Sequence, residues 1–363
     1  MKITILGAGD MGAALTVPLA ERGHTAALWC TDHDDEIHRA LTAGKPHPGL
    51  QSDLPGPVRI FGPGQIEEAM EKADLVILGV STPGVFPVLR QAKPHLRATM
   101  PLLTVAKGFL SRNGTAEPVL SAIQGELQDL GPGARPPLLG LAGPSIAGEI
   151  VRHRPTAAAI AGDDHGQANT LCEKLETDSF WLDSIHDLRG FEICLAYKNI
   201  YSIALAWAEG LSESPGWESA RNLSAILLLQ AVEELRRLIK HRHGNPDTAG
   251  GWSGLGDLAA TAGGGRNGRF GHLLATGKSP DQAAATLEKE GVTTIEGRSA
   301  APHGVDYAAR TLGSDWGAHL PLLHAIRQVL EGEKTVREIV RQIHRFRAGY
   351  STSGIDPNEG APQ

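Results

Sequence analysis

Cysteine is scarce in this chain. The 363 residues include three cysteines, Cys30, Cys172 and Cys194, which lie far apart and form no CxxC pair. This spacing argues against a disulfide framework and favours small buried side chains in a reducing compartment. The fifteen histidines are scattered without clustering, so we expect no metal site.

The chain also lacks an excess of positive charge and any long apolar run. Its formal net charge is −7, and nucleic acid is bound mainly through cationic contacts to phosphate, so we expect no nucleic-acid partner. The longest apolar run, near residues 225–229, is too short for an integral membrane segment. The N-terminus begins with a strand-like run and a glycine turn, which predicts no signal peptide and a cytoplasmic location.

The length of the chain predicts two domains. Over residues 1–188, short apolar runs alternate with helical or turn-rich stretches. The runs are residues 2–6, 25–29, 75–80, 102–105, 138–142 and 157–161. Each is typical of a buried parallel strand, and the alternation predicts an α/β, Rossmann-type doubly wound domain with a parallel sheet.

The pattern becomes helical after residue 188. Helices are expected at residues 188–208, 220–241, 268–274, 279–289, 305–312, 320–331 and 336–346. The first two are apolar around most of their circumference, which is typical of helices central to a core. These features predict an all-α substrate domain over residues 189–346. The tail at 347–363 is rich in Gly, Pro and polar residues and is expected to be poorly ordered.

A glycine turn follows the first predicted strand. Gly7, Gly9 and Gly12 have the GxGxxG spacing of a dinucleotide-binding fingerprint and precede a helix predicted over residues 13–22. Such glycines permit a tight turn and close approach of a pyrophosphate, whose charge the helix N-terminus attracts. The sequence therefore predicts a bound nicotinamide dinucleotide.

The end of the second predicted strand leaves the identity of that cofactor open. Asp32 could hold a ribose hydroxyl, which favours NAD, whereas Thr31 could bond a 2′-phosphate, which allows NADP. The cofactor is therefore NAD or NADP.

Three further loops follow predicted strands at the edge where ligands gather in open α/β sheets. The loop over residues 80–84 contains Ser81, and the loop over 143–145 contains Gly143 and Ser145. Lys107 follows another apolar run and precedes a glycine, so its ammonium is expected to point into the cleft.

Two charged residues interrupt the helical half. Lys198 lies in an apolar helix, where desolvation favours the neutral amine and suits it for proton transfer. The alternative is a side chain that extends its charge to the rim of the helix. Asp257 falls at the predicted start of a helix that runs to Thr261, where it could cap that helix, accept a substrate hydroxyl or hold Lys198 charged.

A second glycine-rich turn precedes a basic and polar pair. Gly263, Gly264 and Gly265 allow positive φ and close approach to a ligand. The guanidinium of Arg266 and the amide of Asn267 offer donors suited to phosphate. A small phosphorylated substrate is therefore expected.

Together these segments resemble the NAD(P)-dependent glycerol-3-phosphate dehydrogenases. The resemblance runs from residue 1 to about 331 and is most specific in GAGDMGAAL, AKGF, AGPSIAGE, AYKN, GLGDL with GGRNGRFG, and IEG at 295–297. It implies a Rossmann domain, a helical substrate domain, and interconversion of dihydroxyacetone phosphate and sn-glycerol 3-phosphate by hydride transfer. It also implies a role in glycerophospholipid synthesis. A homodimer is a possible assembly of the chain.

The resemblance further implies the role of each matching residue. Lys198 is similar to the general acid/base, Lys107 to a catalytic lysine beside substrate and nicotinamide, and Asp257 to an aspartate near the glycerol hydroxyls. Substrate contacts are also implied for Gly143, Ser145, Gly265, Arg266 and Asn267. Cofactor contacts are implied for Gly7, Gly9, Asp10, Met11, Gly12, Thr31, Ser81, Lys107, Ala147, Arg266 and Glu296.

Some positions depart from the family pattern. Asp10 and Met11 replace a small residue followed by an aromatic one, and Thr31 takes a place often held by a basic residue. Two rival functions remain. One is a related dehydrogenase for another 2-hydroxy acid or phosphorylated keto compound, and the other is a cofactor-binding sensor without catalysis.

Overall fold

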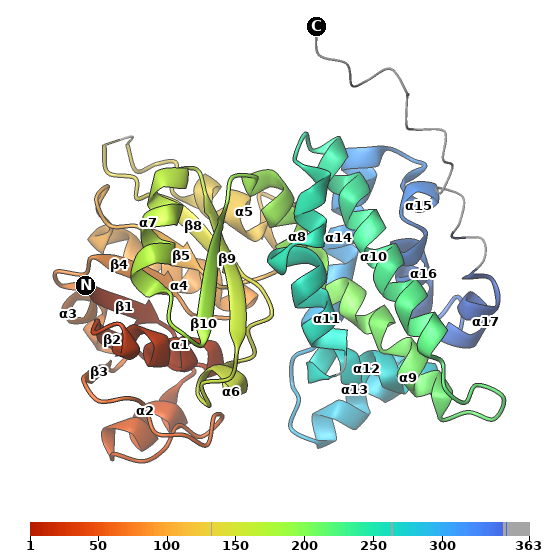
Figure 1. Ribbon diagram of the computed structural model, residues 1–363, viewed down its shortest axis with the longest axis horizontal. Coiled ribbons are helices and arrows are strands. Elements are labelled where there is room, and N and C mark those ends of the chain that lie inside the picture. The colour runs from red at the N-terminus through yellow and green to blue at the C-terminus, as the bar shows by residue number, and fades with distance from the viewer. Residues whose placement is uncertain (132, 263, 344–345, 347–363) are drawn as a thin grey trace, which may run out of the picture.

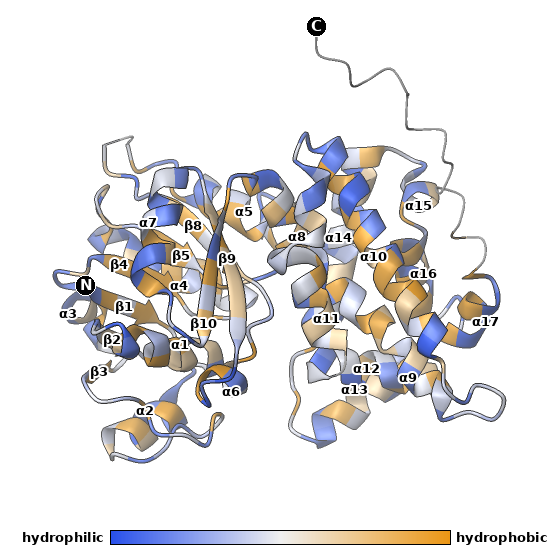
Figure 2. Cartoon of the chain, in the orientation of Figure 1, coloured by the Kyte–Doolittle hydropathy of each residue, from blue (hydrophilic) through white to orange (hydrophobic). Residues whose placement is uncertain are grey.

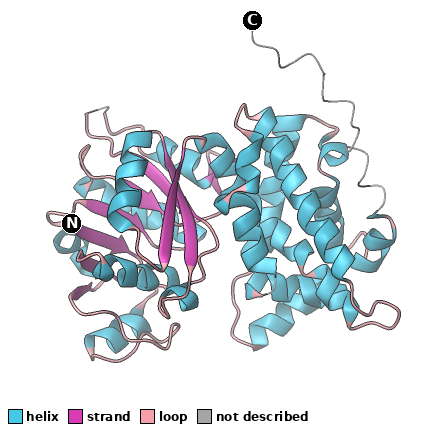
Figure 3. Cartoon of the chain, viewed as in Figure 1, coloured by secondary structure: helices cyan, strands magenta, loops and turns pink. Residues whose placement is uncertain are grey.

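The computed structural model describes residues 1–131, 133–262, 264–343 and 346. Strands fill the N-terminal part and helices fill the C-terminal part, and the two lie side by side (Figures 1 and 3). The α/β Rossmann-type class followed by a helical region is confirmed. The predicted tail at 347–363 and Gly263 lie outside the described residues.

An eight-stranded sheet forms the centre of the N-terminal part, in the order β10-β9-β8-β5-β4-β1-β2-β3. The strands are β1 (Lys2–Leu6), β2 (Thr25–Trp29), β3 (Val58–Phe61), β4 (Leu75–Leu78), β5 (Leu102–Thr104), β8 (Leu138–Ala142), β9 (Thr156–Gly162) and β10 (Phe180–Ile185). From β8 to β3 all neighbours are parallel. Their carboxyl ends therefore meet at one edge, which is where the predicted loops begin.

The prediction that residues 157–161 form a parallel strand is wrong in direction. β9 runs antiparallel to β8, and β10 is parallel to β9. The connection from β8 contains only the four-residue helix α6 (Ala147–Ile150) and turns the chain back at the same edge. An apolar run indicates burial but not strand direction, because direction depends on the connection.

Three other features of the sheet region were not predicted. β3 has a single buried residue, Phe61, and β10 carries an exposed residue after each of its two buried ones, so neither has a continuous apolar run. β6 (Phe109–Arg112) and β7 (Thr115–Pro118) form a separate antiparallel hairpin.

Helices cover both faces of the sheet (Figure 1). They are α1 (Asp10–Glu21), α2 (Asp35–Thr42), α3 (Ile66–Met70), α4 (Val85–Ala92), α5 (Val119–Glu126) and α7 (His165–Leu175), together with α6. In β4, Leu75 and Ile77 belong to one buried cluster, and Val76 and Leu78 belong to the other. This two-sided burial explains why a central strand such as β4 is apolar along its whole length. In Figure 2, β1 is coloured mostly hydrophobic, whereas part of β10 is hydrophilic.

The helical part is built around α8 (Leu188–Leu205). Its other helices are α9 (Trp207–Ser212), α10 (Arg221–His241), α11 (Asp257–Ala262), α12 (Gly265–Ala275), α13 (Pro280–Lys289), α14 (Glu296–Leu312), α15 (Trp316–His319), α16 (Pro321–Leu330) and α17 (Val336–Arg341). A Cβ added to Gly271 would overlap the carbonyl oxygen of Ile203, so α12 lies directly against α8. The helix predicted over 305–312 is the end of the longer α14, and the helix predicted over 188–208 ends at Leu205.

The hairpin β6–β7 joins the two parts. The ring of Phe109 meets Tyr197 of α8 edge-on, with ring centroids 5.2 Å apart. Glu192 of α8 accepts hydrogen bonds from the backbone N–H and the hydroxyl of Ser121 in α5, at 2.6 and 3.0 Å. These contacts hold the loop between β5 and β6 against the central helix of the second part.

Candidate active site

Three charged side chains from three separate segments meet between the two parts. Lys107 follows β5, Lys198 lies in α8, and Asp257 is the first residue of α11. The ammonium of Lys107 pairs with Oδ2 of Asp257, and that of Lys198 lies 3.5 Å from Oδ1. The side chains of Lys107, Lys198 and Asp257 are 16%, 13% and 4% exposed. The structure thus unites three residues named from the sequence, and the burial and pairing of Lys198 argue against the alternative that it extends to the rim.

Burial is the main reason that the pKa of the Lys107 ammonium is lowered. The carboxylate of Asp257 opposes that shift, and the positive charge of Lys198 adds to it. An amine whose pKa moves toward neutrality is better suited to proton transfer. The Asp257 carboxylate also compensates the repulsion between two buried ammonium groups.

The loop that carries Lys107 is held by a threonine that sequence reasoning missed. The hydroxyl of Thr82 donates a hydrogen bond to the carbonyl of Lys107 at 2.6 Å. Thr82 comes directly after Ser81, at the end of β4, and the next residue after Lys107 is Gly108 with φ +121°. The position of Thr82 in a ligand-edge loop was visible from the sequence, but its partner 25 residues away was not.

The predicted substrate turn of Gly143 and Ser145 lies next to the segment that precedes α11. The Ser145 hydroxyl donates to the Gly143 carbonyl at 3.1 Å, which closes the turn. A Cβ added to Gly256 would lie 3.3 Å from Cδ of Pro144, so the two loops are in contact. Ala147 begins α6 just after the turn.

The second glycine-rich turn leads directly into α12. Gly264 is extended, whereas Gly265 has φ +71°, a left-handed conformation that favours glycine. Arg266 and Asn267 follow in the first turn of the helix. The free N–H groups of that turn and the arginine make this end of α12 suitable for an anion.

Arg266 and Asn267 both contact the start of α14. The guanidinium of Arg266 pairs with the carboxylate of Glu296, and Oδ1 of Asn267 accepts from the N–H of Gly297 at 2.8 Å. The side chain of Arg266 is still 53% exposed, so its remaining donors can reach a ligand. A Cβ on Gly297 would overlap the carbonyl oxygen of Asn199, the residue after the α8 lysine. The start of α14 therefore connects the glycine-rich turn to the lysine site.

The first glycine turn has the shape of a cradle. Gly7 has φ +112°, and a Cβ on Gly12 would overlap the Gly7 carbonyl oxygen, so both positions require glycine. A Cβ on Gly9 would meet nothing within 4 Å, which leaves open space before the N-terminus of α1. Asp10 is 60% exposed there, and Met11 is partly buried.

At the end of β2, Asp34 contacts both Thr31 and the first glycine turn. The carboxylate of Asp34 accepts from the N–H and the hydroxyl of Thr31 at 2.7 and 2.8 Å, and from the N–H of Ala8 at 3.3 Å. Asp32 is exposed. Asp34, which sequence reasoning did not name, is thus the acidic residue that contacts the glycine turn; its spacing of three residues from Thr31 was the available signal.

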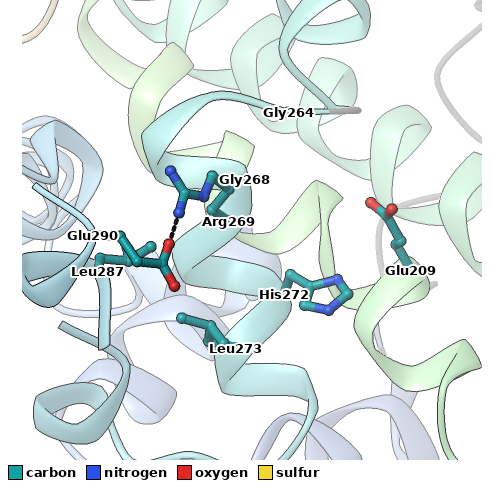
Figure 4. Close-up of a pocket in the computed structure, with 8 residues that line it drawn as sticks. All are labelled: Glu209, Gly264, Gly268, Arg269, His272, Leu273, Leu287 and Glu290. Carbon is teal, nitrogen blue, oxygen red and sulfur yellow. Dashed lines mark hydrogen bonds and ion pairs between the residues drawn. The ribbon is translucent and has the colours of Figure 1, made fainter. Parts of the chain in front are cut away.

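A cavity of about 260 Å³ lies among α9, α12 and α13 (Figure 4). It is lined by Glu209, Gly264, Gly268, Arg269, His272, Leu273, Leu287 and Glu290. Arg269 and Glu290 form an ion pair with each other there (Figure 4). The lining of this cavity includes none of the three clustered charged residues and not Arg266, so the cavity is separate from the candidate active site.

The described residues contain no group of three or more His, Cys, Asp or Glu side chains placed to hold a metal ion. In the same part of the chain, no helix combines the length and apolar character needed to cross a membrane.

Comparison with known proteins gives matches along the whole described chain. Residues 2–168 match the NAD-dependent glycerol-3-phosphate dehydrogenase N-terminus, and residues 187–341 match the C-terminus of the same family. The chain is 37% identical over 347 residues to an NADP(+)-dependent glycerol-3-phosphate dehydrogenase of Archaeoglobus fulgidus, covering 96% of this chain and 100% of the relative. It is 32% identical to a glycerol-3-phosphate dehydrogenase [NAD(P)+] of Anaeromyxobacter sp. (strain K), covering 94% and 96%.

Solved structures share the fold. The glycerol-3-phosphate dehydrogenase of Coxiella burnetii superposes with a TM-score of 0.79 at 24% identity, covering 94% of this chain and 98% of that one. The 2-dehydropantoate 2-reductase of Methylococcus capsulatus reaches 0.54 at 12% identity, covering 98% and 100%. The two family matches and the two relatives do not favour the rival dehydrogenase function. On the two family matches and the two relatives, the chain belongs to the NAD-dependent glycerol-3-phosphate dehydrogenase family.

Proposed function

We propose that this chain interconverts dihydroxyacetone phosphate and sn-glycerol 3-phosphate with NAD(H) or NADP(H). The observation that carries the proposal is the joining of Lys107, Lys198 and Asp257 in one buried cluster, with an anion-binding turn connected to it through α14. Reduction of this ketone needs a hydride, a proton for the new alkoxide and a grip on the remote phosphate. The chain offers a group for each need.

The residues of the first glycine turn fit a dinucleotide. The cradle formed by Gly7 and Gly12 and the open space before Gly9 leave room for a pyrophosphate at the N-terminus of α1. Ser81, Ala147 and the other residues implied by the family resemblance would hold the rest of the cofactor. When bound, the nicotinamide supplies the hydride to C2 of the substrate.

The lysine pair would act at the C2 oxygen. As negative charge develops there, the ammonium groups of Lys107 and Lys198 stabilise it, and Lys198 donates the proton that completes the alcohol. In the reverse direction, the neutral amine of Lys198 accepts that proton. The carboxylate of Asp257 holds the ammonium groups of Lys107 and Lys198 close together. It would also accept a hydrogen bond from a glycerol hydroxyl.

The turn at the start of α12 would bind the phosphate. The backbone of Gly265, the guanidinium of Arg266 and the amide of Asn267 are the proposed donors, while Gly143 and Ser145 contact the substrate from the facing loop. Binding energy from the phosphate then orients the carbonyl at the other end. Glu296 pairs with Arg266, and the family resemblance implies a cofactor contact for both residues.

Several coarser expectations accompany this proposal. We divide the chain into a dinucleotide domain at 1–188, a substrate domain at 189–346 and a tail at 347–363, and we propose a cytoplasmic enzyme without nucleic-acid partners that supplies glycerophospholipid synthesis. We also propose a homodimer, since Ile226 and Leu229 of α10 are 45% and 52% exposed. Light scattering of the purified chain tests the assembly.

Product analysis tests the reaction. The enzyme is incubated with dihydroxyacetone phosphate and a reduced cofactor that carries deuterium at both C4 positions of the dihydronicotinamide, and the product is examined by mass spectrometry. We expect glycerol 3-phosphate with deuterium at C2. Unlabelled product, or faster turnover with 2-dehydropantoate, contradicts the proposal, and tight cofactor binding without any product favours a sensor.

A further inference from the structure

Ala8, inside the first glycine turn, has both of its backbone polar groups bound by distant side chains. Its N–H donates to the carboxylate of Asp34 at 3.3 Å, and its carbonyl accepts from Nε2 of His47 at 2.8 Å. Neither contact belongs to the helix or the sheet. The turn is therefore held from outside, by the segment that connects β2 to β3.

Both ring nitrogens of His47 have polar partners. The ring is fully buried, its Nδ1 accepts from the N–H of Leu50 at 3.2 Å, and Oδ1 of Asp10 lies 4.0 Å from the same nitrogen. With Nδ1 as acceptor, the neutral ring carries its proton on Nε2, which donates to Ala8. The backbone of His47 is also paired, because its N–H donates to the Ser52 carbonyl at 2.8 Å and its carbonyl accepts from Gln51 at 2.9 Å.

The direction of the Ala8 carbonyl decides where the next N–H points. A trans peptide is planar, so the carbonyl of Ala8 and the N–H of Gly9 point in opposite directions. Gly9 is the residue that precedes α1; it is partly exposed, and a Cβ added to it would meet nothing within 4 Å. By holding the Ala8 carbonyl, His47 therefore directs the Gly9 N–H toward the place where a pyrophosphate would bind.

We propose that His47 is a positioning residue for the dinucleotide: it orients the Ala8–Gly9 peptide and thereby raises cofactor affinity without touching substrate or the reacting atoms. This inference rests on the proposed function. It assigns a role in cofactor binding to a buried histidine outside the fingerprint.

Two substitutions separate the two ring contacts. In His47→Gln, the side-chain amide nitrogen can reach the position of Nε2 and donate to Ala8. In His47→Asn, the shorter side chain can place its oxygen near the position of Nδ1 and accept from Leu50, but it cannot reach Ala8. The two variants introduce the same chemical group, so each is the control for the other.

The experiment measures the Kd of NADH and NADPH by fluorescence titration, kcat at saturating cofactor, and the thermal midpoint of each protein. We expect His47→Asn to weaken binding of the preferred cofactor about tenfold, as the loss of one oriented hydrogen bond would. His47→Gln should stay within about threefold of wild type, and kcat should change less than twofold in both. The KM for dihydroxyacetone phosphate should not change.

Three results would overturn the inference. One is an unchanged cofactor Kd in His47→Asn, and another is equal weakening in both variants. The third is a loss of affinity that only follows a fall in thermal midpoint, which a purely structural histidine would produce. Wild-type protein that binds neither cofactor contradicts the proposed function instead, so the two failures are distinguishable.

Discussion

The ammonium of Lys198 lies 3.5 Å from Oδ1 of Asp257. The other oxygen of the same carboxylate pairs with Lys107, so one buried anion holds two cations from the two parts of the molecule. The two ammonium groups are therefore held close together where the two parts of the molecule meet. The chemistry of this arrangement can be tested one residue at a time.

Replacement of Lys198 by methionine should remove the proton donor and keep most of the buried volume. We expect kcat for reduction to fall by about 10² to 10⁴, the range typical of a lost general acid. The cofactor Kd and the thermal midpoint should remain close to wild type, because Asp257 keeps Lys107 as its partner. Near-normal turnover in this variant would remove Lys198 from its proposed role.

Replacement of Asp257 by asparagine should change the pH profile. Asp257 opposes the lowering of the Lys107 pKa, so without its charge that pKa falls further. If reduction needs Lys107 in its charged form, activity is lost as pH rises through the pKa of Lys107. In the Asp257→Asn variant this pKa is lower, so the alkaline limb of the kcat profile moves to lower pH. Asp281→Asn, at a carboxylate that is 91% exposed, is the control. An alkaline limb that stays in place or moves upward would contradict the arrangement.

Replacement of Arg266 by alanine should act on phosphate binding. We expect kcat/KM for dihydroxyacetone phosphate to fall about 10- to 100-fold, mainly through KM, as expected for a lost charged hydrogen bond. Unphosphorylated dihydroxyacetone, a poor substrate, should lose much less. Steady-state kinetics with both ketones measures the difference, and equal losses would argue against a phosphate contact.

Glu234 of α10 should make stability depend on pH. Burial raises its pKa to about 7, although its carboxylate accepts from Gln230, Tyr201 and the N–H groups of Leu322 and Leu323. In the unfolded chain the pKa of this carboxyl is its ordinary 4.5. Between pH 4.5 and pH 7 the Glu234 carboxyl keeps its proton in the folded state and loses it in the unfolded state. The contribution of Glu234 to stability is therefore full below pH 4.5 and declines as pH rises toward 7.

Urea unfolding at pH 5 and pH 7.5 measures this contribution when wild type is compared with Glu234→Gln. At about 1.4 kcal/mol per pKa unit, the wild-type free energy of unfolding should lose a few kcal/mol more than the variant over that interval. Parallel pH dependence in the two proteins would show that Glu234 is charged in the fold throughout.

Local patterns in the sequence predicted much of this molecule. The glycine spacing at Gly7 to Gly12, the polar loops after apolar runs and the apolar helix around Lys198 all depend on neighbours within a few residues. Patterns of this kind identify elements and also the edge of the sheet where ligands gather. They led to the three charged residues before their contacts were known.

Other features depend on contacts between distant segments. The ion pair of Lys107 and Asp257 joins residues 150 positions apart, and no local pattern encodes it. The reversal of β9 depends on how α6 turns the chain, and the contact between Asp34 and Ala8 depends on how the segment after β2 folds back. His47 gave no sequence signal at all, because its role requires the turn it supports.

The central claim is that this chain reduces dihydroxyacetone phosphate at the site around Lys107, Lys198 and Asp257. The most direct measurement is the initial rate of cofactor oxidation by the purified chain with this substrate, using NADH and NADPH in turn. The account predicts rapid oxidation of at least one cofactor that depends on the substrate. Oxidation of neither cofactor would contradict it.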